Sequence, residues 1–484
     1  MSAGSGTIDG YMLTSAVLLL LPLYAQETPT EKLAAKGVLE KLAVLEKSID
    51  APGWVKRLTV PNPERDAVVA RAKQLMESEL VAVSDEITRD PEIGFVEKRA
   101  VQKLSTWLKK HDFEVEAGVG GLQTAFTARW TGGPKTASPV MGVIVEYDAL
   151  RGTQRPFHGD QHSAQGPIGL ATAVAMTEFL KKSGTPGTVI VFGTPGEEMM
   201  PPNAKRQMLE AGVFKGVDVF VRSHSSTATT RPAPGFGTCC LNIDGVKFTF
   251  SGAPSHQMMP WDGRNALEAV IHFFVNIDSV RASIRPEARI QGIITEGGAA
   301  PNVVPDRTVA DFYVRYPDAV YLEQVRKFVD DSARAAALAT QTKVKIETYG
   351  IMRDGISVAT LGELGFAYAK RYGATHVDET PAKPQGYEET GGLSSEVPGL
   401  GLGIFSSNSS YHTYGMEADT LTDVGHSAFV MDAEAMTAVL YDYAKNPQFR
   451  EAVKKEFAGI KELFGEYQEA LRKVYQTPVV PEPK

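Results

Sequence analysis

The chain has 484 residues, which is more than one ordinary hydrophobic core accommodates, so we expect two or more domains. Its composition is that of a soluble globular protein, and a net charge of −8 without a basic cluster argues against nucleic acid as a partner. The two cysteines, Cys239 and Cys240, are adjacent, so no disulfide framework is implied.

The N-terminal segment contains a mostly apolar run over residues 11–25. Fifteen residues are too few for a stable membrane span but suit the core of a secretory signal, with cleavage after Ala25. Residues 1–25 are therefore predicted to be a signal peptide, and the protein to be exported to the periplasm or secreted. No lysine or arginine precedes the run, so a cytoplasmic protein with a buried N-terminal helix stays the alternative.

A helix over residues 31–48 is expected within an N-terminal segment of residues 26–62. Its apolar side chains are expected to pack on the rest of the chain: Leu33, Val38, Leu42 and Leu45. A long amphipathic helix is predicted from the break at residues 61–63 to about residue 86.

Apolar strands then alternate with helices, which predicts a doubly wound, mainly parallel α/β sheet. The strands are expected at residues 123–130, 140–146, 188–192, 217–222 and 401–405, and two of the helices at residues 166–182 and 203–211. This catalytic domain is assigned to residues 63–243 and 351–445.

The pattern changes near residue 244, where strands and helices follow in the order β-α-β-β-α-β of a ferredoxin-like unit. The strands are expected to end near residue 250 and to span residues 290–295, 308–316 and 343–348, with helices at about 264–280 and from 319. We expect an inserted lid or dimerisation domain at residues 244–350, and a helical tail at residues 446–484.

Two adjacent carboxylates, Glu197 and Glu198, follow the strand at residues 188–192 and the turn at Pro195-Gly196. In open α/β sheets, ligands bind beyond the carboxyl ends of the strands. One carboxylate can therefore hold a metal while the other moves a proton on a metal-activated water. The alternative is a pair of solvated loop acids.

Further potential ligands also follow strands: His158, Asp160 and His162 after the strand that ends near Asp148, then His224, and then His412. Taken singly, each histidine is more often a structural residue. Because all of them come after strands, they are expected to meet at one rim of the sheet with Glu197 and Glu198. Imidazoles and carboxylates there suit zinc or manganese, and an aspartate bridging two ions would make a two-metal hydrolytic site.

Several segments match a known family in order between about residues 65 and 445: residues 146–150, 158–162, 193–198, 208–214, 252–267, 297–306 and 394–398. The sequence resembles the dinuclear-metal aminoacylase and carboxypeptidase-G family of amidohydrolases, especially the branch that contains aminobenzoyl-glutamate utilization protein B. The resemblance implies a catalytic domain of the phosphorylase/hydrolase-like, zinc-peptidase type. It also implies an inserted lid through which the chain forms a homodimer.

Carried over to this sequence, the resemblance implies a role for each matching residue. Glu197 would be the general base, and the metal ligands would be Asp160, His162, Glu198, His224 and His412. Asp148 would orient a ligand histidine. His256 would stabilise the oxyanion and could do so in the partner subunit's site, while Asn302 and Arg315 would hold the substrate. Two divalent ions are implied, with zinc first and manganese or cobalt as alternatives.

One residue departs from the branch, whose first motif reads His-Ala-Cys-Gly-His, because here Asp160 takes the place of the cysteine. A carboxylate can bridge metals, so the change is expected to shift the metal preference towards harder ions. A degenerate site is the alternative.

The sequence therefore predicts a metal-dependent amidohydrolase. Its substrate would be a small N-acyl amino acid, an aminobenzoyl-glutamate-like compound or a dipeptide. The alternative is a catalytically inactive metal- or ligand-binding protein on the same scaffold. A serine hydrolase is set aside because no Gly-x-Ser-x-Gly elbow follows a strand.

Overall fold

The computed structural model describes residues 29–133, 137–200, 203–238, 241–382, 391–476 and 480. The predicted signal peptide and the cysteine pair Cys239 and Cys240 lie outside these ranges. Within them, no helix combines the length and the apolar character that a membrane crossing requires.

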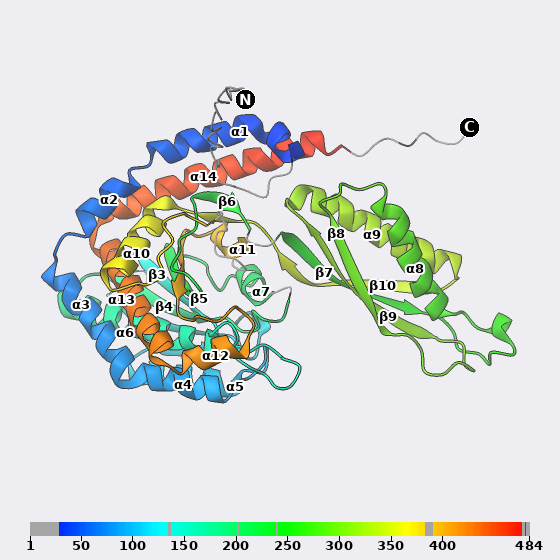
Figure 1. The fold of residues 1–484 in the computed structure, drawn as a ribbon, viewed down its shortest axis with the longest axis horizontal. Helices are drawn as coiled ribbons and strands as arrows, with labels where there is room; N and C mark the ends of the chain where they lie inside the picture. Colours follow the sequence, from blue (N-terminus) through cyan, green and yellow to red (C-terminus); the bar gives the residue numbers. More distant parts are fainter. Residues whose placement is uncertain are drawn as a thin grey trace, which may run out of the picture.

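A six-stranded sheet forms the centre of the larger unit, with the strand order β1-β2-β4-β3-β5-β12 (Figure 1). Its strands are β1 Glu114–Ala117, β2 Phe126–Gly132, β3 Val140–Val145, β4 Gly187–Gly193, β5 Val219–Ser226 and β12 Gly399–Phe405. The four strands β4, β3, β5 and β12 are parallel to one another. At one edge, β2 runs antiparallel to β4, and β1 runs antiparallel to β2. The expectation of a mainly parallel α/β sheet is confirmed.

Helix α6 (His162–Ser183) packs on the central strands and is buried along most of its length. Gly169 allows its close approach, because a Cβ atom there would lie 2.3 Å from the side chain of Val145 on β3. The helix begins at His162, whereas the sequence predicts a start at Gly166. Gly166 and Pro167 look like a helix start, but the preceding turn is helical because its side chains pack in the interior, where Ser163 accepts a hydrogen bond from Thr88.

Other helices surround α6 and the sheet. They are α2 Ala51–Leu58, α3 Pro63–Leu75, the π-helix η1 Met76–Leu80, α4 Val81–Arg89, α5 Lys98–Lys110, the 3₁₀ turn η2 Val119–Gly121, α7 Ala204–Glu210, α10 Ala359–Arg371, α11 Gly391–Ser394, α12 Tyr414–Thr420 and α13 Asp423–Lys445. The predicted long helix after residue 63 is therefore the continuous run of α3, η1 and α4, with a π-helical turn in its middle.

The smaller unit is an antiparallel sheet with the strand order β10-β7-β9-β8, and it lies to the right in Figure 1. Its elements are β7 Asn242–Ser251, the 3₁₀ turn η3 Pro260–Asp262, α8 Ala266–Arg281, β8 Arg289–Glu296, β9 Arg307–Tyr316, α9 Ala319–Ala339 and β10 Lys343–Met352. Helices α8 and α9 cover one face, where Phe248, Phe273 and Phe312 pack together. The chain order β-α-β-β-α-β is that of a ferredoxin-like unit.

The smaller unit, residues 242–352, is called the lid. Two short strands, β6 (Gly235–Gly237) and β11 (Gly355–Ser357), pair antiparallel next to the two chain segments that lead into and out of it. Between those segments, Asn242 donates to the carboxylate of buried Asp354 over 3.0 Å and accepts from its backbone N–H. These hydrogen bonds hold the entering and leaving segments together.

The last helix, α14 (Pro447–Val474), runs beside α1 (Pro29–Ser48) and extends towards the lid (Figure 1). It packs on β6, where Phe236 contacts Phe464 and Tyr467. Beyond its end, buried Tyr475 packs against Tyr321 of the lid and donates to Asp318 over 3.0 Å. The tail therefore contacts both units.

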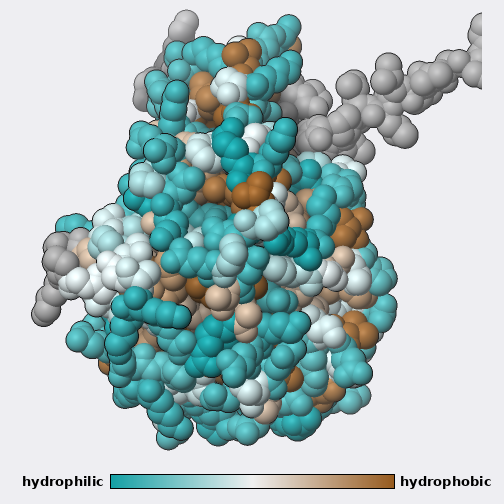
Figure 2. All heavy atoms as spheres, turned by 90° about the vertical axis from the view of Figure 1, so that its left-hand side faces the viewer, coloured by the Kyte–Doolittle hydropathy of each residue, from teal (hydrophilic) through white to brown (hydrophobic). Residues whose placement is uncertain are grey.

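Helix α1 packs on α14, so its buried residues include Val38 and Leu42, as the periodicity predicted. The expectation for Leu33 is wrong, since its side chain is 82% exposed near the start of α1. The side of the molecule at the left of Figure 1 presents a largely hydrophilic surface (Figure 2).

Candidate metal centre

Residues 158–162 span the end of the connection from β3 to α6 and the first residue of α6, and they bring two candidate ligands into the interior. Gln161 adopts a left-handed conformation with φ 55°, which residues other than glycine rarely adopt. Its side chain holds this geometry by accepting from the Ser406 hydroxyl over 2.6 Å and donating to the Met416 carbonyl over 2.9 Å. Asp160 and His162, on either side of Gln161, are both buried.

His158 has a different place from the other two candidate ligands of this loop. In the described residues, two groups of side chains have potential ligand atoms that all lie within 4.8 Å of one another, and His158 belongs to neither group. Burial lowers the pKa of its ring to about 3. Its backbone N–H donates to Glu417 over 3.0 Å, so this residue anchors the loop to α12.

Glu197 and Glu198 lie in the turn after β4, and two carboxylates of the same unit hold that turn. Glu97 accepts from the N–H of Gly196 over 2.8 Å, and Asp148 accepts from the N–H of Glu198 over 2.8 Å. Gly196 has φ 68°, a conformation that glycine adopts without strain. The side chain of Glu198 is buried and that of Glu197 is nearly so.

His224 lies within β5, because this strand extends through Ser226 and does not end at Arg222 as predicted. Residue 224 pairs with Gly403 of β12, so the neighbouring parallel strand supports the extension. Its Nδ1 lies 2.8 Å from the carbonyl oxygen of Ser225. A hydrogen bond there leaves Nε2 as the nitrogen that faces the other candidate ligands.

His412 follows β12 and has a left-handed backbone with φ 58°. Its N–H donates to the carbonyl of Gly159 over 3.1 Å, which joins this loop to residues 158–162. Its Nε2 lies 2.9 Å from Oδ2 of Asp160 and 4.0 Å from Oε2 of Glu198. Strained backbone at a cluster of polar residues is a common feature of functional sites.

His162 lies at the centre of the cluster. Its Nδ1 is 3.0 Å from Oδ1 of Asp148, and its Nε2 is 3.4 Å from Nε2 of His224 and 3.8 Å from Oε2 of Glu197. His162, Asp160 and Glu198 form one compact group of potential ligands. The structure thus brings together Asp148, Asp160, His162, Glu197, Glu198, His224 and His412.

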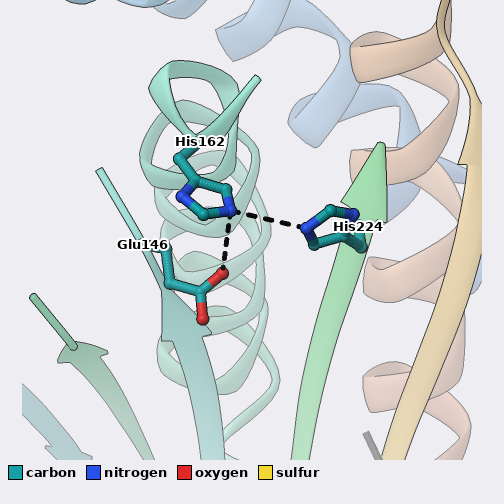
Figure 3. Close-up of side chains that lie close together, drawn as sticks. All are labelled: Glu146, His162 and His224. Atoms are coloured by element: carbon teal, nitrogen blue, oxygen red, sulfur yellow. Dashed lines mark hydrogen bonds and ion pairs between the residues drawn. The ribbon is translucent and has the colours of Figure 1, made fainter. Parts of the chain in front are cut away.

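Glu146 is a further member of this cluster, and no role was predicted for it from the sequence. It forms a second compact group with His162 and His224, and Figure 3 shows its carboxylate pointing to the His162 ring, 3.6 Å from Nε2. The carboxylate is fully buried and pairs with Lys205 of α7 and with Arg222 of β5. One signal was available, since Glu146 and Asp148 are two residues apart at the end of a strand and therefore face the same side.

The cluster carries an excess of negative charge. It contains the five carboxylates of Glu146, Asp148, Asp160, Glu197 and Glu198 and the two cations Lys205 and Arg222, which both pair with Glu146. With all seven groups ionised and the histidines neutral, three negative charges remain.

This excess changes the protonation of the buried groups. Burial raises the pKa of Glu198 to about 8. Burial alone would lower the pKa of His162, but the carboxylates of Asp148, Glu146 and Glu198 raise it well above its usual value. The raised pKa of His162 marks a cluster in which carboxylates outnumber positive charges, and divalent cations would balance them.

The donor set fits such cations. Carboxylate oxygens and imidazole nitrogens are ligands for zinc and for manganese or cobalt, and no thiolate is present among the residues brought together. Oδ1 of Asp160 is buried and has no hydrogen-bond partner in the described residues, although its other oxygen lies next to His412. A buried carboxylate oxygen of this kind requires a positively charged or donor group.

None of the three candidate residues of the lid belongs to the groups of potential ligands in the described residues. His256 is in the segment before η3 and Asn302 is in the connection between β8 and β9, both exposed and joined through the bridge of His256 to Val303. In Figure 1 this end of the lid is far from β3 and β5. Arg315 is on β9, and its buried Nε has no hydrogen-bond partner among the described atoms.

His256 is nevertheless oriented for a donor role. Its Nδ1 accepts from the N–H of Met258 over 3.1 Å, so the ring proton resides on Nε2. The side chain is exposed, which leaves this N–H available to another molecule.

Comparison with known proteins agrees with the fold. A family model described as a peptidase dimerisation domain matches residues 241–341. The human protein named Xaa-Arg dipeptidase is 30% identical over 405 residues, covering 78% of this chain and 88% of that protein. The B subunit of the p-aminobenzoyl-glutamate hydrolase of Escherichia coli (strain K12) is 30% identical over 279 residues, covering 54% of this chain and 56% of that protein.

Among solved structures, the aminobenzoyl-glutamate utilization protein from Klebsiella pneumoniae has a TM-score of 0.58 at 16% sequence identity. The match covers 77% of this chain and 98% of that chain, which shows a shared fold. Together the fold, the cluster and the relatives define a metal-dependent hydrolase of amide bonds. The chain belongs to the M20 family of dinuclear-metal peptidases and amidohydrolases.

Proposed function

We propose that this chain hydrolyses the amide bond of a small N-acyl amino acid, an aminobenzoyl-glutamate-like compound or a dipeptide. The observation that carries the proposal is the convergence of Asp160, His162, Glu198, His224 and His412 on one pocket beside Glu197. The names of the relatives, a dipeptidase and part of an aminobenzoyl-glutamate hydrolase, support this range of substrates.

The five residues Asp160, His162, Glu198, His224 and His412 would hold two divalent ions, with zinc first and manganese or cobalt as alternatives. When bound, the ions supply Lewis-acid activation of a water molecule and of the substrate carbonyl. Asp148 orients His162 through its contact with Nδ1, which directs Nε2 into the pocket.

Glu197 is the proposed general base. Oε2 of its carboxylate lies 3.8 Å from Nε2 of His162. From this position it can take a proton from the attacking water and deliver it to the departing amine. The turn is fixed through Gly196 and Glu198, so this carboxylate is held in place before the substrate arrives.

The lid would complete the site from a second copy of the chain. Strand β8 is at the edge of the lid sheet and exposes Ile293 and Ile294, so two copies can meet there in a homodimer. His256 of one copy would then donate from Nε2 to the oxyanion in the partner's pocket. Asn302 and Arg315 would hold the substrate's carbonyl or carboxylate.

The test combines metal content with hydrolysis. Purified protein is analysed by elemental mass spectrometry and assayed on N-acyl amino acids, aminobenzoyl-glutamate and dipeptides, including those that end in arginine. About two ions per chain, with hydrolysis that a chelator abolishes and added metal restores, are expected. Bound metal without hydrolysis of any of these amides would instead support the inactive binding protein.

The variant Glu197→Gln separates catalysis from metal binding. It should keep both ions and lose turnover by about a thousandfold, because the amide cannot accept the proton. The matched control is Glu210→Gln at the end of α7, where the carboxylate pairs with exposed Arg206. Near-normal turnover in Glu197→Gln would reject Glu197 as the base.

A further inference from the structure

The turn that carries Glu197 and Glu198 is held by a third hydrogen bond, and this one comes from the lid. The hydroxyl of Tyr313 on β9 donates to the carbonyl oxygen of Met200 over 2.6 Å. Met200 is two residues beyond Glu198. The turn is thus held near its beginning by Glu97, in its middle by Asp148 and at its end by Tyr313.

Tyr313 is on the face of the lid sheet that α8 and α9 leave uncovered. Along β9 the buried residues Phe312 and Val314 alternate with the partly exposed residues Tyr313 and Arg315. The guanidinium of Arg315 lies over the Tyr313 ring, 5.6 Å from its centroid. The proposed carboxylate anchor and the contact to the turn are therefore neighbours on one rigid strand.

We propose that Tyr313 is a positioning residue that transmits the position of the lid, and of a substrate held by Arg315, to the turn that carries the base Glu197. The role of Glu197 rests on the proposed function, whereas the contact between the lid and the turn does not. A shift of the lid relative to the sheet would move or break the bond to Met200. Catalysis is sensitive to such shifts, since a displacement of about 1 Å can cost up to a hundredfold in rate.

The bond itself contributes little to overall stability. A single neutral hydrogen bond at a solvent-accessible position makes only a small net contribution to folding, because water replaces it in the unfolded chain. Removing the hydroxyl should therefore leave the fold and the metal ligands in place, so a loss of rate can be assigned to the position of the turn.

The experiment compares Tyr313→Phe with Tyr321→Phe in the metal-loaded full chain. Tyr321 is the matched control, because its hydroxyl is also on the lid but accepts from the N–H of Arg285 over 3.1 Å, away from the turn. Tyr313→Phe should lower kcat roughly tenfold with KM changed by less than about twofold, while Tyr321→Phe stays near wild type in both constants.

Hydrogen–deuterium exchange of a peptide that includes residues 196–200 gives a readout independent of activity. In Tyr313→Phe these amides should exchange faster than in wild type and in Tyr321→Phe. Unchanged exchange in Tyr313→Phe, or equal acceleration in both variants, would overturn the proposal. If the wild-type chain hydrolyses no amide, the proposed function fails, and the exchange comparison still decides whether the lid holds the turn.

Discussion

The two groups of residues proposed to act on the substrate differ in their surroundings. The proposed metal ligands follow or lie on β3, β4, β5 and β12 and are mostly buried among side chains of their own unit. At the far end of the lid, His256 lies among exposed apolar side chains, with Met258 77% and Trp261 70% exposed. One group is completed by the fold of a single chain, whereas the other presents apolar surface that a monomer would leave in water.

This contrast separates two ways of building a site. A buried cluster is preorganised, because its ligands are fixed by hydrogen bonds such as those of Gln161 and His224 before any partner is present. An exposed donor such as His256 can serve only a group that approaches it from outside. Assembly of two chains would therefore control turnover without changing the metal ligands.

Among variants of the lid, His256→Ala should have the largest effect. Loss of an oxyanion donor typically lowers kcat by about 100- to 1,000-fold, while the metal content should stay unchanged. Steady-state kinetics and elemental analysis of the same preparation measure both quantities.

Mixed dimers test whether His256 serves the partner. A dimer of one Glu197→Gln chain and one His256→Ala chain would contain one complete site, because the intact His256 of the first chain reaches the intact Glu197 of the second. Random pairing of equal amounts should restore roughly a quarter of the wild-type activity, whereas each variant alone is almost inactive. If mixing restores no activity, His256 does not serve the site of the partner chain, and the proposal that two chains complete the site is wrong.

A smaller effect is expected from Asp160→Cys in the buried cluster. A thiolate is a softer ligand than a carboxylate, so the variant should prefer zinc over manganese by about tenfold more than the wild type does. Competition between the two ions, followed by elemental analysis, measures this ratio without any activity assay. An unchanged ratio would show that Asp160 is not a metal ligand, and His256→Ala is the matched control because it should leave the ratio as in wild type.

The smallest effect concerns the junction between the two units. Burial raises the pKa of Asp354 to about 7, so between pH 4 and pH 7 the folded chain binds a proton that the unfolded chain has lost. The stability that this proton provides is complete below the unfolded pKa and is lost as the pH rises through 7, with a slope of at most about 1.4 kcal/mol per pH unit.

Asp354→Asn removes this pH dependence, because the amide does not titrate. Relative to wild type, the variant should become more stable as the pH rises from 5 to 8, as measured by thermal unfolding at each pH. Asp278→Asn, on an exposed helix face of the lid with its side chain 71% exposed, is the control and should show no such trend. A constant difference between Asp354→Asn and wild type would show that Asp354 ionises normally.

Much of the buried cluster could be predicted because it follows from one local rule. Glu197, Glu198, His162 and His412 all lie in or at the end of the segments that follow apolar strands, and parallel strands end at the same edge of a sheet. The ferredoxin-like order of the lid was also readable, since each of its elements has its own hydrophobic periodicity.

The parts that were missed depend on which segments become neighbours. Glu146 pairs with Arg222 because β3 lies beside β5, and with Lys205 because α7 packs nearby. These contacts span 76 and 59 residues along the chain, and no local pattern records them. The same holds for the bond of Tyr475 to Asp318, which joins the C-terminal helix to the lid across 157 residues.

That last contact has a thermodynamic consequence. Inserted domains joined only by two linkers often melt separately from their host, since few interactions are shared. Here Tyr475 is buried against Tyr321, while α14 is packed on β6 of the other unit through Phe464. Neither unit can unfold without exposing apolar surface of the other, so calorimetry should record one cooperative transition whose van't Hoff and calorimetric enthalpies agree.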